Sequence, residues 1–304
     1  MSDVESTAGT RVLRSGSTSQ GLLLTLLGDY WFGQQVHIPS AALVALLGEF
    51  DISEQAARAA LSRVQRTGLL EGVKEGRHTS YRLSERAAEQ ALVRGRDILS
   101  FTAQTEADAP SWDGRWTIVA YSVHSDRSDE RRRIRRRLRA LGFAPLQDAL
   151  WVSPLRRAER VERALESIGA TRVSIFEGAD LRDVASLDVG QAWKLDDLGR
   201  RYGAIIDELS AALDRAMSGP PVPSDAFVTR TKAMTSWRPM RWIDPRLPPA
   251  LLPDEWPGWA ARRTFAALYD RLGEPAVERM REIVAAHSEE AAAALRFDTV
   301  TGPR

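Results

Sequence analysis

The side chains best suited to recognise another molecule lie on a predicted helix that runs from Ala56 to Arg66. Ser53 precedes this helix at a typical N-cap position, and Gly68 follows it where helices often end. The apolar residues of the helix share one face, which we expect to be buried: Ala57, Ala60, Leu61 and Val64. Any recognition chemistry must therefore come from the opposite face.

That opposite face is small, polar and basic. Small residues let a helix axis approach the floor of the DNA major groove, amide and guanidinium groups read base edges, and flanking arginines meet phosphates. We therefore predict that the helix and its cap contact DNA through Ser53, Gln55, Arg58, Ala59, Ser62, Arg63 and Arg66.

A hairpin with a basic tip follows this helix. Leu69–Lys74 and Thr79–Leu83 have the pattern of two strands, and the residues between them form the turn. The imidazole of His78 at the tip is expected to contact a phosphate or the minor groove, or to be exposed, rather than to catalyse a reaction. The tip residues that complete the predicted DNA interface are Lys74, Arg77 and His78.

Further helices have to hold this interface in place. Pro39 suits the first turn of a helix, and the spacing of apolar residues predicts helices over residues 19–32, 40–47 and 84–99. Three helices followed by a hairpin are typical of a winged helix-turn-helix DNA-binding domain, which we place at residues 19–102. A purely structural three-helix unit is the alternative.

The middle of the chain has a different pattern. After a predicted linker at residues 103–112, the order of predicted elements is βαββαβ over residues 113–190, which is the ferredoxin-like pattern. This scaffold hosts many unrelated functions, so it constrains architecture more than activity. The predicted elements are Trp116–Val123, Asp126–Leu141, Phe143–Leu146, Ala149–Ser153, Arg156–Ile168 and Thr171–Phe176.

The run Arg131–Arg139 is the strongest local charge feature of the sequence. It is either a solvated helix face, in which Asp129 and Glu130 favour the helix N-terminus and the arginines pair with neighbours, or an anion-binding surface. The anion would be a DNA phosphate or a phosphate-bearing effector. The sequence leaves these interpretations open.

The last third of the chain is mainly helical, and we treat residues 191–304 as a C-terminal domain. Prolines in residues 238–259 exclude regular structure there, although the aromatic content predicts that this segment packs. Predicted helices occupy residues 193–217, 260–271 and 275–286, and another starts at Asp225. The polar residues 1–18 are predicted to be a mobile tail. The expected fold class is thus α+β and multidomain.

Composition excludes several classes of protein. The 304 residues have a net charge of +1 and contain no cysteine, which removes disulfides and thiolate metal sites. No apolar run is long enough to cross a bilayer, and the first residues lack a signal-peptide pattern, so we expect a cytoplasmic protein without a membrane partner. The four histidines are scattered and predict no metal site.

Several segments together resemble the PaaX family of repressors of bacterial phenylacetate degradation. The similar segments are Leu24–Tyr30, Ile52–Leu70, Asp244–Pro248 and Leu251–Gly258. The resemblance spans roughly residues 20 to 285, and its proline-rich C-terminal part is the most specific. It implies a homodimeric repressor of a catabolic operon that binds inverted-repeat double-stranded DNA. It also implies release from DNA by an acyl-CoA effector such as phenylacetyl-CoA, and no cofactor.

The effector-binding residues are inferred from side-chain chemistry. Arginines suit coenzyme A phosphates and tryptophans suit an adenine or aryl ring, whereas the alternative is that the tryptophans only anchor the loop. The candidates are Arg238, Arg241, Trp242, Arg246 and Trp256.

Two other functions are alternatives to that of a ligand-controlled regulator. A metal-dependent nuclease of the ferredoxin-like type would use Asp126, but this residue lacks an obvious second carboxylate, and metal-assisted phosphoryl chemistry usually draws on more than one acid. An effector-independent DNA-binding protein would not need so large a C-terminal region. We therefore expect no enzymatic activity.

Overall fold

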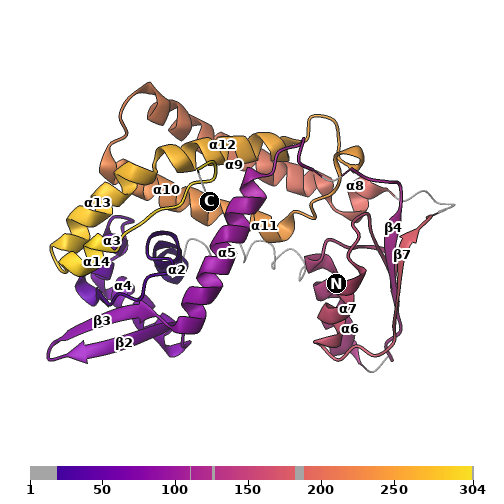
Figure 1. Ribbon diagram of the computed structural model, residues 1–304, viewed down its shortest axis with the longest axis horizontal. Helices are drawn as coiled ribbons and strands as arrows, with labels where there is room; N and C mark the ends of the chain where they lie inside the picture. The colour runs from indigo at the N-terminus through magenta and orange to yellow at the C-terminus, as the bar shows by residue number, and fades with distance from the viewer. Residues whose placement is uncertain (1–18, 110, 125–126, 182–187, 303–304) are drawn as a thin grey trace. The chain divides into compact units, whose positions relative to one another are not determined.

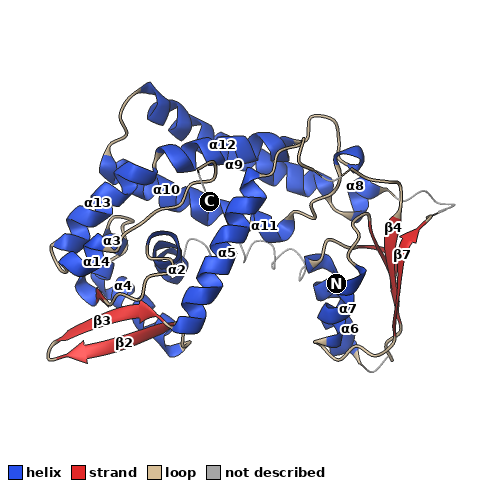
Figure 2. Cartoon of the chain, in the orientation of Figure 1, coloured by secondary structure: helices blue, strands red, loops and turns tan. Residues whose placement is uncertain are grey.

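The computed structural model describes residues 19–109, 111–124, 127–181 and 188–302. The predicted N-terminal tail and Asp126 lie outside the described residues. Helices dominate the structure, and strands occur in two separate sheets (Figure 2).

The described residues gather into two compact units, neither of which is one continuous stretch of chain. The described residues within Met1–Ala103, Ile205–Pro239 and Ala260–Arg304 form unit 1, and those within Gln104–Ala204 and Met240–Trp259 form unit 2. The region predicted as a C-terminal domain, residues 191–304, is therefore divided between the two units.

Unit 1 starts with three helices, a hairpin and a long helix, in the order that the sequence predicts (Figure 1). The last of these helices continues to Ala103, beyond the predicted end at residue 99, because Phe101 and Thr102 are buried. The elements are α2 (Ser19–Tyr30), α3 (Ser40–Gly48), α4 (Glu54–Arg66), β2 (Leu70–Glu75), β3 (His78–Leu83) and α5 (Glu85–Ala103).

A third strand, β1 (Ile38–Pro39), was not predicted. It pairs antiparallel with β3 and gives the sheet order β1-β3-β2, with Ile38 opposite Tyr81. Two residues are too few to show strand alternation. The expectation that Pro39 lies in the first turn of α3 is wrong by one position, since Pro39 is the N-cap and ends the strand. A proline, which has no N–H to donate, fits an edge strand of this kind.

The C-terminal helices of unit 1 share a core with the first three helices. Phe227, Val277 and Met280 belong to the same buried apolar cluster as residues of α2, α3 and α4. Figure 1 shows the C-terminal helices beside α2 and α3. These helices are α10 (Pro223–Trp237), α13 (Gly273–Ala285) and α14 (Glu289–Ala293), to which α9 (Leu195–Ser218) adds its part from Ile205 and α12 (Pro257–Arg271) its part from Ala260.

Several starts of these helices differ from the prediction, since α12 begins at Pro257 instead of Ala260 and α13 at Gly273 instead of Pro275. α10 begins at Pro223 instead of Asp225, because proline is well tolerated in the first turn of a helix. α14 was missed: Ser288 caps this short helix by accepting a hydrogen bond from the Ala291 backbone N–H at 3.1 Å.

Unit 2 contains the predicted βαββαβ order, which the structure confirms. The strand order is β5-β6-β4-β7 and every neighbouring pair is antiparallel, as in a ferredoxin-like sheet. The two helices lie side by side on one face of this sheet (Figure 1) and bury Ile134, Leu138 and Val161 against it. The elements are β4 (Trp116–Tyr121), α6 (Ser128–Ala140), β5 (Ala144–Gln147), β6 (Leu150–Ser153), α7 (Ala158–Glu166) and β7 (Val173–Ala179).

The proline-rich segment is more regular than predicted. It contains one helical turn, α11 (Met240–Ile243), and a 3₁₀ turn, η1 (Pro249–Leu251), so the expectation of no regular structure is wrong. The expected packing is present, since Leu247 and Trp256 are buried. A further short helix, α8 (Val189–Ala192), was not predicted.

Candidate functional site

α4 is the element on which the predicted DNA interface depends, and local interactions define both of its ends. The Ser53 side chain accepts a hydrogen bond from the Ala56 backbone N–H at 3.3 Å, as predicted for an N-cap. Gly68 adopts the left-handed conformation, with φ of +74°, just beyond the last turn. The predicted apolar stripe is buried, with Ala57 and Ala60 fully inaccessible. The sequence therefore fixes which face of α4 points outward.

The outward face of α4 is available to a partner. Every predicted contact residue on it is exposed except Ala59, which is half-buried. Arg58 forms an ion pair with Glu54 at 2.8 Å. Within the described part of the chain, Arg63 and Arg66 make no hydrogen bond or ion pair through their side chains. Two guanidinium groups are thus free to meet an anion.

The hairpin lies against α4 at a glycine. A Cβ atom at Gly72 of β2 would come within 2.7 Å of Gln65 Nε2 on α4 and 3.1 Å of Tyr81 Cε1 on β3. Gly72 therefore allows a close approach that a larger residue would disturb. Sequence reasoning missed this role, because an isolated glycine in a strand has several explanations.

The hairpin tip is a two-residue turn. Glu75 and His78 are the last paired residues, and Gly76, with φ of +61°, occupies the first turn position, as a type II′ turn requires. The predicted tip residues are all exposed. Across the strands, Arg82 and Glu71 form an ion pair at 2.9 Å.

Residues from the C-terminal helices contact the end of α3, which packs against α4. Phe227 contacts Phe50 edge-to-face, with ring centroids 5.2 Å apart. Arg279 of α13 binds the Glu49 carboxylate through two nitrogens, at 2.9 and 3.1 Å. Bidentate pairs of this kind fix geometry as well as adding energy. The predicted interface is therefore supported from a part of the chain about 200 residues away.

Unit 1 also contains a buried arginine, Arg230, with 0% of its surface exposed. Its guanidinium lies 3.6 Å from the ring centroid of Tyr269. Nε donates to the Tyr269 carbonyl at 3.0 Å and Nη2 to the Asp298 carbonyl at 2.8 Å, whereas Nη1 has no hydrogen-bond partner among the described atoms. This arginine is committed to the interior.

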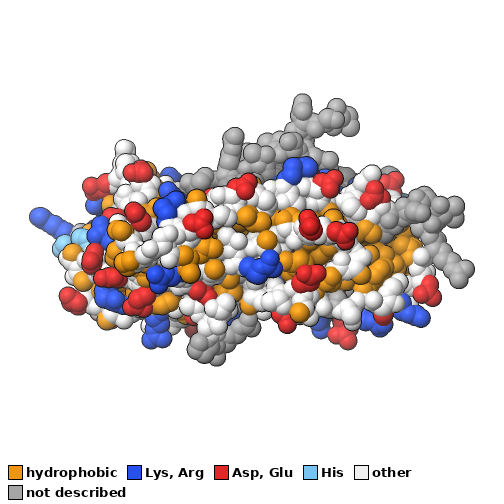
Figure 3. Space-filling model, turned by 90° about the horizontal axis from the view of Figure 1, so that it is seen from above, with side chains coloured by type: hydrophobic (Ala, Val, Ile, Leu, Met, Phe, Trp, Pro, Cys, Tyr) orange, Lys and Arg blue, Asp and Glu red, His pale blue; other side chains and the backbone are white. Residues whose placement is uncertain are grey.

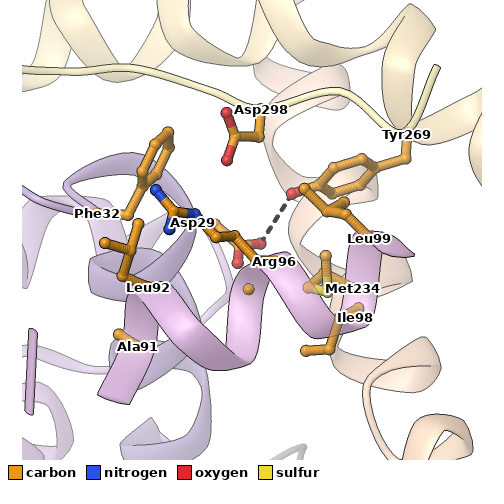
Figure 4. Close-up of a pocket in the computed structure, with 12 residues that line it drawn as sticks. Asp29, Phe32, Ala91, Leu92, Arg96, Ile98, Leu99, Met234, Tyr269 and Asp298 are labelled. Atoms are coloured by element: carbon orange, nitrogen blue, oxygen red, sulfur yellow. Dashed lines mark hydrogen bonds between the residues drawn. The ribbon is translucent and has the colours of Figure 1, made fainter. Parts of the chain in front are cut away.

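Asp29 of α2 lies close to this arginine and lines a pocket with α5. The Tyr269 hydroxyl donates a 3.4 Å hydrogen bond to its carboxylate, which Figure 4 shows across the pocket from α5. Desolvation raises the pKa of Asp29 to about 6, although the charges of Arg230 and Arg238 and the bond from Tyr269 oppose this shift. The pocket volume is about 30 Å³, which is room for about two water molecules.

The predicted effector residues fall in different surroundings. Arg238 ends α10 in unit 1, and the other four belong to unit 2. Trp242 is 57% exposed and stacks with Arg241, whose guanidinium carbon lies 3.8 Å from the ring centroid. Trp256 is buried and packs edge-to-face on Tyr202 at 5.9 Å.

Arg246 has arginine neighbours that sequence reasoning missed. Burial, followed by the charges of Arg160 and Arg246, lowers the pKa of Arg157 to about 10. The Arg157 side chain donates to the Leu141 carbonyl at 2.5 Å, and no carboxylate is among the causes of its pKa shift. The fold thus brings Arg246 near Arg157 and Arg160, and this cluster of three arginines also has a carboxylate beside it, since Asp244 accepts a hydrogen bond from the Arg246 backbone N–H at 2.6 Å.

Basic side chains do not cover the face that Figure 3 shows. On the face shown in Figure 3, acidic and basic side chains are interspersed among hydrophobic ones, in keeping with the net charge of +1. Among the described residues there is no group of three or more acidic or histidine side chains that could hold a metal ion. None of the described helices has the length and apolarity needed to cross a membrane.

Comparison with known proteins matches three family models along the chain. Residues 18–87 match the PaaX-like protein model, residues 109–188 the PaaX central Cas2-like domain, and residues 193–282 the PaaX-like C-terminal domain. The transcriptional repressor PaaX of Escherichia coli (strain K12) is 27% identical over 268 residues, which cover 86% of this chain and 82% of that protein.

A solved structure supports the fold. The uncharacterized protein Rv0674 from Mycobacterium tuberculosis aligns with a TM-score of 0.55 and 23% identity, over 88% of this chain and 98% of that one. Together the comparisons define a non-enzymatic regulator. The chain belongs to the PaaX family.

Proposed function

We propose that this protein is a DNA-binding transcriptional repressor whose residues 19–102 form a winged helix-turn-helix. The observation that carries the proposal is the outward face of α4, where Arg63 and Arg66 have no partner among the described residues and lie beside small and amide side chains. A helix of this kind fits the major groove, which is about 12 Å wide. The hairpin tip would then reach the backbone or the minor groove as a wing.

The repressor would act as a homodimer on inverted-repeat DNA in the cytoplasm. Two-fold symmetric regulators bind two half-sites that are separated by about one helical turn. The similarity to a transcriptional repressor supports this mode of action. The nuclease alternative has no support from that similarity, and its key residue lies outside the described part of the chain.

Arg63→Ala tests the DNA interface. We expect the affinity for a fragment from upstream of the protein's own gene to fall by about 1–3 kcal/mol at matched salt. Arg281→Ala on α13 is the matched control, because Arg281 is also exposed and the change in charge is the same. Equal affinities of wild type and Arg63→Ala would refute the assignment of α4.

We further propose that an acyl-CoA thioester, such as phenylacetyl-CoA, releases the repressor from DNA. The polyanionic coenzyme suits the cluster of Arg157, Arg160 and Arg246, and the exposed Trp242 offers a stacking surface for an adenine or aryl ring. The pocket beside Asp29 is too small and too acidic for this ligand. The wider predicted effector set remains Arg238, Arg241, Trp242, Arg246 and Trp256.

A panel of aryl and aliphatic CoA thioesters in a mobility-shift assay tests the effector. The inducing thioester should dissociate the DNA complex and raise the melting temperature of the free protein. Arg157→Gln should weaken the response without altering DNA affinity in the absence of thioester. If the protein binds DNA and no thioester of the panel has an effect, the acyl-CoA effector is excluded while the proposed DNA binding stands.

A further inference from the structure

α6 of unit 2 has two chemically different halves. Ile134 and Leu138 are buried against the sheet, with 1% and 0% of their surface exposed. The outward half carries five exposed guanidinium groups, from Arg132, Arg133, Arg136, Arg137 and Arg139. The contacts of each arginine therefore distinguish the two alternatives that the sequence leaves open, which are a solvated face and an anion-binding face.

Some arginines of α6 are occupied within unit 2. Arg131 donates to the Val123 carbonyl, Arg132 pairs with Asp129, and Arg135 contacts Tyr121 and the Asp148 carbonyl. The Arg139 guanidinium lies 5.5 Å from the centroid of the Trp151 ring. These four side chains have structural neighbours that account for them.

The other three arginines of α6 have no such neighbours in the part of the chain that the structure describes. Arg133, Arg136 and Arg137 make no side-chain hydrogen bond, ion pair or ring contact within the described ranges of the chain. Arg136 and Arg137 lie three and four residues after Arg133, which puts both side chains next to that of Arg133 on the helix surface. We name this group the α6 triad.

The triad is unfavourable for the isolated helix. Like charges at these spacings destabilise a helix by roughly 0.2–0.5 kcal/mol per pair. The two acids of α6, Asp129 and Glu130, lie in its first turn, and they pair with Arg132 and Arg127 rather than with the triad. A bound polyanion would compensate the repulsion.

The chemistry of this face favours the phosphates of nucleic acid over a lipid surface. Interfacial membrane helices carry large apolar side chains opposite their basic face, whereas the apolar side chains of α6 are buried in the domain core. The guanidinium fork matches a phosphate in a bidentate manner. Unlike the outward face of α4, the described residues of α6 include no amide side chain beside the arginines, so we assign the guanidinium groups to phosphates.

We propose that the α6 triad is a second DNA-contacting surface, which binds backbone phosphates of duplex DNA without reading sequence. This inference rests on the proposed function of the protein, in which α4 reads the bases. The central domain would then add sequence-independent affinity to the complex.

The salt dependence of DNA binding tests the triad. We compare the full-length wild type with Arg133→Gln/Arg136→Gln/Arg137→Gln on the upstream fragment, by fluorescence anisotropy between 50 and 200 mM KCl. Each lost phosphate contact lowers the slope of log K against log[salt] by about 0.9. We expect the slope to fall by about two to three and the affinity to fall on the order of tenfold to a hundredfold.

The matched control is Arg215→Gln/Arg263→Gln/Arg281→Gln, which removes three exposed arginines from α9, α12 and α13 and changes the net charge equally. Its slope should equal that of the wild type. Replacing the triad by lysine keeps the charge and should restore most of the slope. Unaltered thermal unfolding and oligomeric state show that each variant is intact.

The outcomes separate this inference from the proposed function. A wild-type protein that does not bind the fragment refutes the proposed function. A triad variant with the wild-type slope refutes the second surface and leaves α4 as the interface. A triad variant whose slope falls because its oligomeric state changes, or one that loses only binding to phosphatidylserine vesicles, also overturns the inference.

Discussion

Unit 1 uses arginine in two opposite ways. Arg230 is fully buried, stacks on Tyr269 and donates to two backbone carbonyls. Arg63 and Arg66 on α4 project from an exposed helix face and have no partner within the described part of the chain. The buried guanidinium stabilises the fold, whereas the exposed ones are available to a ligand. Stability and DNA binding should therefore respond to different arginines.

Replacing Arg230 should give the largest effect. Arg230→Met fills similar space but removes the charge that opposes the desolvation of Asp29, and it leaves the buried Tyr269 carbonyl and the part-buried Asp298 carbonyl without this donor. Removing one partner from a buried charged network typically costs about 3–5 kcal/mol. Urea unfolding measures this loss. Arg215→Met, at an exposed site, should change the free energy of unfolding by less than about 0.5 kcal/mol.

A loss below about 1 kcal/mol for Arg230→Met would contradict the assigned role. It would mean that the pocket beside Asp29 rehydrates readily. Arg230 would then differ from the exposed arginines in its position but not in its contribution to stability.

Asp29 gives the second effect, and it depends on pH. Its pKa is about 6 in the folded protein against an ordinary 3.8, so between these values the folded state holds a proton that the unfolded state releases. The stability contributed by this carboxyl is complete below about pH 4 and is lost as the pH rises through about 6.

Asp29→Asn should therefore gain stability relative to wild type as the pH rises. The amide is neutral at every pH and keeps an oxygen that accepts from the Tyr269 hydroxyl. The difference in free energy of unfolding should increase by at most about 3 kcal/mol between about pH 4 and 7, at about 1.4 kcal/mol per unit of pKa shift. Denaturant unfolding across this range measures it. A difference that stays flat or decreases with pH would contradict the raised pKa of Asp29.

The same contrast explains what the sequence could predict. The signals for α4 are local: Ser53, the apolar stripe and Gly68 lie within 16 residues of one another, and each obeys a rule of helix chemistry. The exposed residues of the predicted DNA interface followed from that register alone. The βαββαβ order followed in the same way from the alternation of strand and helix patterns.

The buried network could not be predicted, because its members are far apart in sequence. Asp29 and Tyr269 are 240 residues apart, and Arg230 lies within a helix whose pattern gives no hint of burial. The strand β1 was missed because its two residues show no periodicity. The cluster of Arg157, Arg160 and Arg246 could not be predicted either, because Arg246 is far from the other two in sequence and comes near them only in the fold.

Ser53→Ala tests whether the cap of α4 serves both stability and DNA binding. The Ser53 side chain caps the helix, and its replacement by alanine should cost about 1 kcal/mol of stability. Because the same residue belongs to the predicted DNA interface, affinity should fall as well. Ser53→Asp retains the cap but adds a negative charge near phosphates, so thermal stability should recover while DNA affinity does not. Recovery of both would show that Ser53 acts only through the fold.

The smallest expected effect on stability belongs to the exposed pair of Glu54 and Arg58. Their side chains are 67% and 56% exposed, so breaking this pair should cost about 0.3–0.5 kcal/mol or less. DNA binding should separate the two partners. Arg58→Gln removes a phosphate contact and should weaken affinity, whereas Glu54→Gln removes a competing carboxylate and should strengthen it.

Anisotropy titrations and thermal unfolding of these two variants, measured in parallel, test that separation. If Glu54→Gln weakens DNA binding as much as Arg58→Gln does, the ion pair itself is required for binding. Arg58 would then act through the fold, as Arg230 does, and not by direct contact with DNA as proposed for Arg63. If the two changes act in opposite directions while both melting temperatures stay within a degree or two, Arg58 serves the DNA and Glu54 only restrains it.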